Sequence, residues 1–279
     1  MANQTISIYR IKFEKIFNKF ENWRWNLHSR LGIALKSTFC QIKKASPKEC
    51  RNCFRKIFCP VAQIFFRNWI SGKIPPLPLR FSTTPNSNNS LYLFEYEPGT
   101  AKLTFEALKT FESEDFKVVS MRKVFSFSPE ILLDHHSQLI EFATKLLKIK
   151  LSNPFSFKIS NICLPKSTSQ DINSIKELLS SLTYNKTRII LLFMGIWEDF
   201  KEHSFNLKDF TNYVETMNFS ISTLQVFSHR NQNFITYPVL NCEISFSEFN
   251  NEVAKFLICA KVFGSGKMSS VYSDVTVIN

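Results

Sequence analysis

Apolar side chains recur at intervals of three and four residues near the start of the chain. Between residues 10 and 31 these positions are Phe13, Ile16, Phe17, Phe20, Trp23, Leu27 and Leu31, with lysines and arginines between them. Such spacing places the apolar side chains on one face of a helix. The sequence therefore predicts a basic amphipathic helix, which either packs on the body of the protein or lies on an anionic lipid or an acidic partner.

A second basic and aromatic segment runs from Arg51 to Ile70 and is expected to be broken or kinked at Pro60. The apolar side of this segment is predicted to comprise Phe54, Ile57, Phe58, Val61, Phe65 and Trp69. Residues 74–90 are rich in Pro, Ser and Asn, which is typical of a linker. We therefore expect a basic helical segment over 1–73, a linker over 74–90 and a folded domain over 91–279.

Strands and helices are expected to alternate in residues 91–279. The β-branched and aromatic content predicts strands in "SLYLFEYEP", "FKVVSMRKVFSF", "PFSFKISNICL", "RIILLFMGIW", "STLQVFS", "VLNCEISF" and "SVYSDVTVI". Helices are predicted after Ser128 and Pro129, through Ile172 to Leu182, in "LKDFTNYVETM" and from Ser247 to Ala260. The predicted fold class is α/β, either layered or stacked as an irregular solenoid.

The excess positive charge lies at the N-terminal end of the chain. The net charge is +12, and residues 1–73 account for all of it, with fifteen Lys and Arg against three acidic residues. A localised basic field attracts nucleic acid, an anionic membrane surface or an acidic partner. The candidate contact residues are Lys12, Lys15, Lys19, Arg24, Arg30, Arg51, Arg55 and Lys56.

Seven cysteines, without a recognisable secretory signal at the start of the sequence, favour free thiols in a reducing, intracellular compartment, cytoplasmic or nuclear. Cys40, Cys50, Cys53 and Cys59 are spaced C-x9-C-x2-C-x5-C, whereas structural zinc sites usually supply two close pairs. We expect ordinary thiols and no metal here, with zinc as the alternative. No apolar run reaches the roughly 18 residues of a membrane-spanning helix.

Catalytic and cofactor motifs are not recognised in the sequence. The "GSGK" at Gly264 to Lys267 lacks the earlier glycine and the following Ser or Thr of a phosphate-binding loop, so its glycines are expected to end a helix. His135 and His136 are adjacent on a predicted helix and point about 100° apart, which does not favour joint chelation of one ion. We therefore expect no cofactor and no enzymatic activity.

Three blocks between residue 131 and about 266 resemble, in order, the F-box-associated region of the nematode F-box protein families. They are "ILLDHHSQLIEFATKLLKIKLSNPFSFKIS", "DINSIKELLSSLTYNKTRIILLF" and "FSEFNNEVAKFLICAKVFGSG". In the last block Ser247, Asn251, Phe256, Leu257 and Gly264 follow the family's pattern without its tryptophan, and no clear F-box precedes the region. The resemblance implies a non-enzymatic protein-recognition module that presents substrates to a ubiquitin ligase.

The alternative function is binding of nucleic acid or an anionic membrane surface through the basic N-terminal segment. Aromatic residues that could stack on bases lie among its cations, namely Trp23, Trp25, Phe54 and Trp69. An enzyme is the third candidate.

Overall fold

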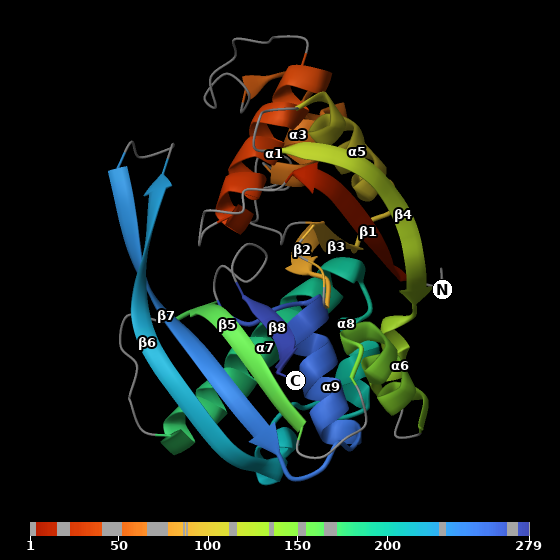
Figure 1. Ribbon diagram of the computed structural model, residues 1–279. Coiled ribbons are helices and arrows are strands. Elements are labelled where there is room, and N and C mark those ends of the chain that lie inside the picture. Colours follow the sequence, from red (N-terminus) through yellow and green to blue (C-terminus); the bar gives the residue numbers. More distant parts are fainter. Residues whose placement is uncertain are drawn as a thin grey trace. The chain divides into compact units, whose positions relative to one another are not determined.

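The structure of the 279-residue chain is a computed structural model. It describes residues 4–15, 23–40, 52–65, 78–85, 87, 89–111, 116–133, 137–149, 155–164, 172–228, 233–266 and 273–278. The described residues form seven α-helices and two four-stranded antiparallel sheets (Figure 1). The chain divides into two compact units, Thr5–Phe127 and Ser128–Asn279, the latter together with Met1–Gln4.

The first unit has the strand and helix order of a split βαβ fold. Its elements are β1 (Ile6–Lys15), α1 (Trp23–Phe39), the 3₁₀ helix η1 (Lys56–Phe58), α3 (Pro60–Phe65), β2 (Leu79–Thr83), β3 (Ser90–Glu95), α5 (Thr100–Thr110) and β4 (Lys117–Phe127). The strands lie in the order β2-β3-β1-β4, and every pair is antiparallel. This order defines a ferredoxin-like unit.

The second unit repeats this order. Its elements are the 3₁₀ helix η2 (Pro129–Leu133), α6 (Ser137–Leu147), β5 (Phe155–Cys163), α7 (Ile172–Met194), α8 (Trp197–Glu202), η3 (Asp209–Tyr213), β6 (Val214–Ser228), β7 (Asn233–Phe246), α9 (Asn251–Val262) and β8 (Asp274–Ile278). The sheet order is β6-β7-β5-β8. The α/β class expected from the sequence is thus confirmed, whereas the solenoid-like arrangement finds no support in these two sheets.

The prediction of one helix over residues 10–31 is wrong for residues 10–15. Residues 10–15 belong to strand β1, where Ile11 and Phe13 are fully buried and alternate with the polar Lys12 and Glu14. That period of two is the pattern of a strand with one face in the core. Pairing with a strand on each side of β1 therefore outweighs the helix-like spacing of three and four residues, which continues in the sequence after β1.

Over residues 23–31 the structure does have a helix, because α1 begins at Trp23. The side chains of α1 that pack into the core of the first unit recur at helical spacing and are Leu27, Leu31, Ala34 and Leu35. They join Ile11, Phe13 and residues of α5, a helix that the sequence analysis did not predict. Predicted core residues Ile16, Phe17 and Phe20 lie outside the described residues.

The segment after α1 differs from the expected amphipathic helix. Pro60 is the first residue of α3, a position that tolerates the missing N–H. Val61 is buried as expected, but Phe54, Ile57 and Phe58 are exposed. The three apolar side chains before Pro60 therefore do not belong to the core.

The division expected at residues 74–90 is also not the one in the structure. Strand β2 lies within that range, and β1 pairs with β3 and β4 on its far side. The basic N-terminal residues thus supply an interior strand of the first sheet.

In the second unit, the predicted strand "RIILLFMGIW" is wrong for residues 188–194. Helix α7 continues without interruption to Met194. Ile189 and Leu192 are 44% and 48% exposed while Ile190 and Leu191 are buried, so only one side of this apolar run enters the core. The helix predicted directly after Pro129 is a 3₁₀ turn, and α6 starts later, at Ser137.

The hairpin of β6 and β7 is longer than the rest of its sheet (Figure 1). Strand β5 pairs with β7 from Val239 to Phe246, whereas β6 continues to pair with β7 as far as Asn233. The outer part of the hairpin is therefore a two-stranded ribbon.

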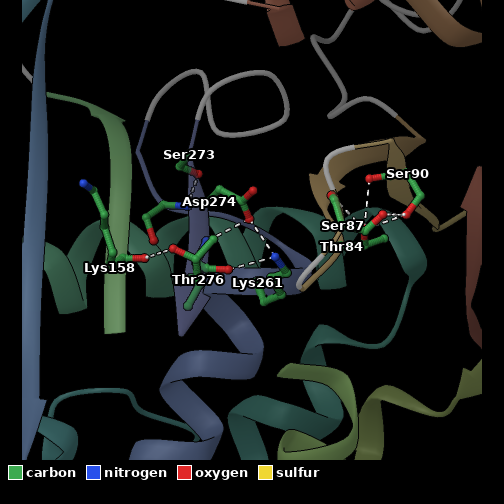
Figure 2. A network of polar contacts seen from close by, with 10 residues as sticks. Thr84, Ser87, Ser90, Lys158, Lys261, Ser273, Asp274 and Thr276 are labelled. Atoms are coloured by element: carbon green, nitrogen blue, oxygen red, sulfur yellow. Dashed lines mark hydrogen bonds and ion pairs between the residues drawn. The ribbon is translucent and has the colours of Figure 1, made fainter. Parts of the chain in front are cut away.

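A buried ion pair joins the end of α9 to the start of β8 (Figure 2). Lys261 Nζ lies 2.9 Å from Asp274 Oδ1 and donates to the carbonyl oxygen of Val275 at 2.8 Å. The same carboxylate oxygen accepts the Val275 N–H at 2.8 Å. The two side chains are 1% and 0% exposed, so each charge compensates the other inside the core.

We expect Lys261→Met to reduce the free energy of unfolding by about 3–5 kcal/mol, because it leaves the Asp274 carboxylate buried without its counter-charge. The double variant Lys261→Met with Asp274→Asn should recover most of this loss. Chemical denaturation followed by circular dichroism measures both. The control is Lys201→Met, whose partner Glu198 is exposed, and it should change stability little. Equal stability of the single and double variants would contradict the coupling.

Cutting the chain at the observed division should give a folded fragment, because residues 128–279 contain all four strands of the second sheet. A fragment of residues 91–279 should be less soluble and should unfold less cooperatively. This fragment keeps β4 but lacks β1, so buried side chains such as Phe116 and Val118 lose the strand that covers them. Solubility and the cooperativity of thermal unfolding distinguish the fragments. A cooperative, soluble 91–279 fragment alongside an unfolded 128–279 fragment would contradict the division.

Candidate functional site

Strand β1 turns two of its basic side chains away from the helices of the first unit. Ile11 and Phe13 belong to the core cluster that includes α1 and α5. Successive side chains of a strand point to opposite faces, so Arg10 and Lys12 lie on the other face of the sheet. Lys12 is exposed and Arg10 is half-buried. This sheet face is therefore where the N-terminal charge becomes accessible.

Strand β4 adds a third cation to the same face. Arg10 lies directly opposite Arg122, and Lys12 lies opposite Ser120. Within the described residues, neither Lys12 nor the exposed Arg122 has a hydrogen bond or ion pair. Like charges opposite each other destabilise an antiparallel pair. Arg10, Lys12 and Arg122, here called the cationic patch, therefore form a site that an anion would stabilise.

Hydroxyl groups at the turn between β2 and β3 hold Arg10 in place. Arg10 Nε donates to Ser90 Oγ at 3.1 Å. The Ser90 hydroxyl in turn lies 2.8 Å from the hydroxyls of Ser87 and Thr84 (Figure 2). Because this cluster fixes one nitrogen of the guanidinium, Arg10 loses less side-chain entropy when its other donors bind a ligand.

Tyr92 on β3 lies opposite Arg10 on the other side of β1. Burial raises the pKa of the Tyr92 hydroxyl, and the positive charge of Arg10 opposes that shift. Its ring lies 6.2 Å from that of Phe94. Tyr92 and Phe94 are 4% and 0% exposed, so neither presents a free ring face to a base. The patch can hold charged groups but is not an aromatic stacking surface.

The acidic side chains near the cationic patch already interact with other residues. Glu14 forms a 2.8 Å ion pair with Lys117. Glu95 lies on the helix side, where its carboxylate accepts the Ala101 N–H at 2.8 Å and the Tyr9 hydroxyl at 3.1 Å. Burial and the neighbouring Glu95 raise the pKa of Tyr9. The three charges of the patch are therefore not neutralised by these carboxylates.

The residues expected from the sequence to contact a polyanion do not form one surface. Lys12 is in the cationic patch, and Arg55 and Lys56 lie together on the turn before α3. Arg30 of α1 is half-buried with its guanidinium 5.3 Å from the centre of the Phe111 ring. The remaining residues of that set have side chains outside the described part of the chain: Lys15, Lys19, Arg24 and Arg51.

Two residues of the patch, Arg10 and Arg122, were missed by sequence reasoning. The alternation around Arg10 in "IYRIKF" was the signal that could have placed it beside Lys12 on one strand face. Arg122 could not be assigned in this way, because its position opposite Arg10 depends on strand pairing between distant segments.

Among the described residues, no group of three or more His, Cys, Asp or Glu side chains could hold a metal ion. Cys50 lies outside them, so the expectation of no zinc stays a prediction. Burial raises the pKa values of the Cys242 and Cys259 thiols to about 12, which makes both poor nucleophiles. Gly264, at φ +85°, follows α9 as the expected helix-ending glycine.

Comparison with known proteins gives no family for the chain. No protein-family model matches it, and none of the curated proteins matches it. The resemblance to the F-box-associated region therefore stays a prediction. None of the described helices is long and apolar enough to cross a membrane.

Solved structures that are similar to the chain include Cas6 proteins and CRISPR RNA-processing endoribonucleases. Cas6 of Thermus thermophilus is 10% identical with a TM-score of 0.43, and the match covers 100% of both chains. A Cas6 product complex is 9% identical with a TM-score of 0.42, over 98% of this chain and 100% of that one. The endoribonuclease Cse3 bound to a 19-nucleotide RNA is 10% identical with a TM-score of 0.33, over 99% and 100%.

These matches correct two expectations. The function inferred from the sequence was a recognition module for a ubiquitin ligase, and the chain was expected not to be an enzyme. Both are contradicted by neighbours that are RNA-processing enzymes. At 9–10% identity and TM-scores below 0.5, no residue role passes from those proteins to this chain.

Proposed function

We propose that the chain binds single-stranded nucleic acid through its phosphate backbone, at the cationic patch of the first sheet. The observation that carries this proposal is the direct cross-strand pairing of Arg10 with Arg122, beside Lys12. Like charges on directly opposite residues of paired strands disfavour the pairing, and a phosphate bound at these residues replaces that repulsion with charge-assisted hydrogen bonds.

Geometry favours a backbone ligand over base stacking. Two aromatic side chains of this face, Tyr92 and Phe94, are buried. Arg10 is fixed by Ser90, while Lys12 and Arg122 are exposed, so one anchored cation and two adjustable ones can follow successive phosphates. Recognition of this kind has little sequence preference and weakens strongly with salt.

We expect Arg122→Gln and Lys12→Gln each to weaken binding of a fluorescent single-stranded RNA by about three- to tenfold at moderate salt. Each should reduce the slope of log K against log salt by about 0.7–1, since each removes one phosphate contact. Fluorescence anisotropy at several salt concentrations measures both. Neither side chain has a described partner, so folding should be unchanged.

The matched control is Lys102→Gln, which removes the same charge from the exposed side of α5, on the helix layer of the same unit. It should leave affinity and slope close to those of the unaltered chain. Equal losses for Lys102→Gln and Arg122→Gln would overturn the proposed site in favour of diffuse attraction. Denaturing gels of the same samples record whether bound RNA is cut.

A further inference from the structure

The turn before α3 presents three apolar side chains to solvent. Phe54, Ile57 and Phe58 are 81%, 55% and 84% exposed. Both phenylalanines are exposed much further than any other large hydrophobic side chain in the described residues. Contiguous apolar side chains at this level of exposure mark an interaction surface rather than normal surface scatter.

The turn is held in this conformation by its own backbone. The N–H groups of Lys56, Phe58 and Cys59 donate to carbonyl oxygens three residues earlier, at 3.1, 3.0 and 3.3 Å. Gln63 of α3 donates from its side chain to the carbonyl oxygen of Ile57 at 3.0 Å. Buried Val61 of α3 anchors the other end. The apolar side chains therefore project from a fixed support.

Two cations accompany these side chains. Arg55 is exposed, with its guanidinium 5.3 Å from the centre of the Phe54 ring, and Lys56 is half-buried. The described stretch 52–65 contains no acidic residue. We call Phe54, Arg55, Lys56, Ile57 and Phe58 the apolar knob.

We infer that the apolar knob inserts into the headgroup region of an anionic lipid bilayer and attaches the first unit to that surface. Phe54, Ile57 and Phe58 lie within five consecutive residues of one short turn, and each is at least 55% exposed. All three can enter hydrocarbon together, while the basic side chains remain at the level of the lipid phosphates.

A bilayer fits these side chains better than nucleic-acid bases do. Stacking needs free ring faces, but Arg55 covers one face of Phe54, and Ile57 has no ring to offer. The knob shares no residue with the cationic patch, so this inference does not rest on the nucleic-acid proposal.

The test uses the full chain and sucrose-loaded vesicles of phosphatidylcholine with or without phosphatidylglycerol. Phe54→Ser and Phe58→Ser should each lower the partition coefficient on anionic vesicles at least about tenfold, because each removes one inserting ring. Arg55→Gln should lower it by about fivefold, and only on the anionic vesicles. Because both phenylalanines are solvent-exposed, the Phe54→Ser and Phe58→Ser variants should unfold at the same temperature as the unaltered chain.

The matched control is Leu192→Ser, an exposed apolar residue on α7 of the other unit, which should leave partitioning unchanged. Arg122→Gln should likewise retain vesicle binding, which separates this surface from the cationic patch. Unchanged sedimentation of Phe54→Ser and Phe58→Ser would overturn the inference. So would loss of RNA binding or of self-association by these variants without loss of vesicle binding, because base stacking or a second copy of the chain would then explain the exposed rings.

Discussion

The first unit depends on hydrogen bonding along both edges of β1. This strand lies between β3 and β4, so its backbone groups are satisfied only when segments from the far end of the unit are in place. The same pairing sends Ile11 and Phe13 into the core and Arg10 and Lys12 to the opposite face. One strand therefore couples the stability of the unit to the position of its charges, and the basic N-terminal residues form part of the fold itself.

The sequence was a good guide where local pattern and tertiary environment agree. Strands β3, β4 and β5 were predicted from their β-branched and aromatic content, and the helix expected from Ser247 to Ala260 corresponds to α9. Prediction from the sequence was wrong where one stretch of residues fits both the two-residue period of a strand and the spacing of a helix. In β1 the alternation of Ile11 and Phe13 competes with helical spacing to later residues, and only the neighbouring strands decide. In α7 a continuous apolar run is helical with one side exposed.

Individual candidate residues were easier to predict than their grouping. Net charge pointed to the N-terminal segment, which contains Lys12 and Arg55, but the structure separates these onto a sheet face and a turn. Arg122 joins Lys12 from the other side of the presumed linker. The exposed phenylalanines were assigned to a buried helix side, because spacing alone does not say whether a matching surface covers an apolar face.

The pairing of β1 with β4 also constrains how the chain folds as it is synthesised. Ile6 pairs with Phe127, so the first sheet can close only after the chain as far as residue 127 has left the ribosome. Until then β1 has one unpaired edge and is exposed to incorrect partners. Arg10 and Lys12 give this unpaired strand a positive charge, and like charges of this kind disfavour its pairing with another copy of the same strand.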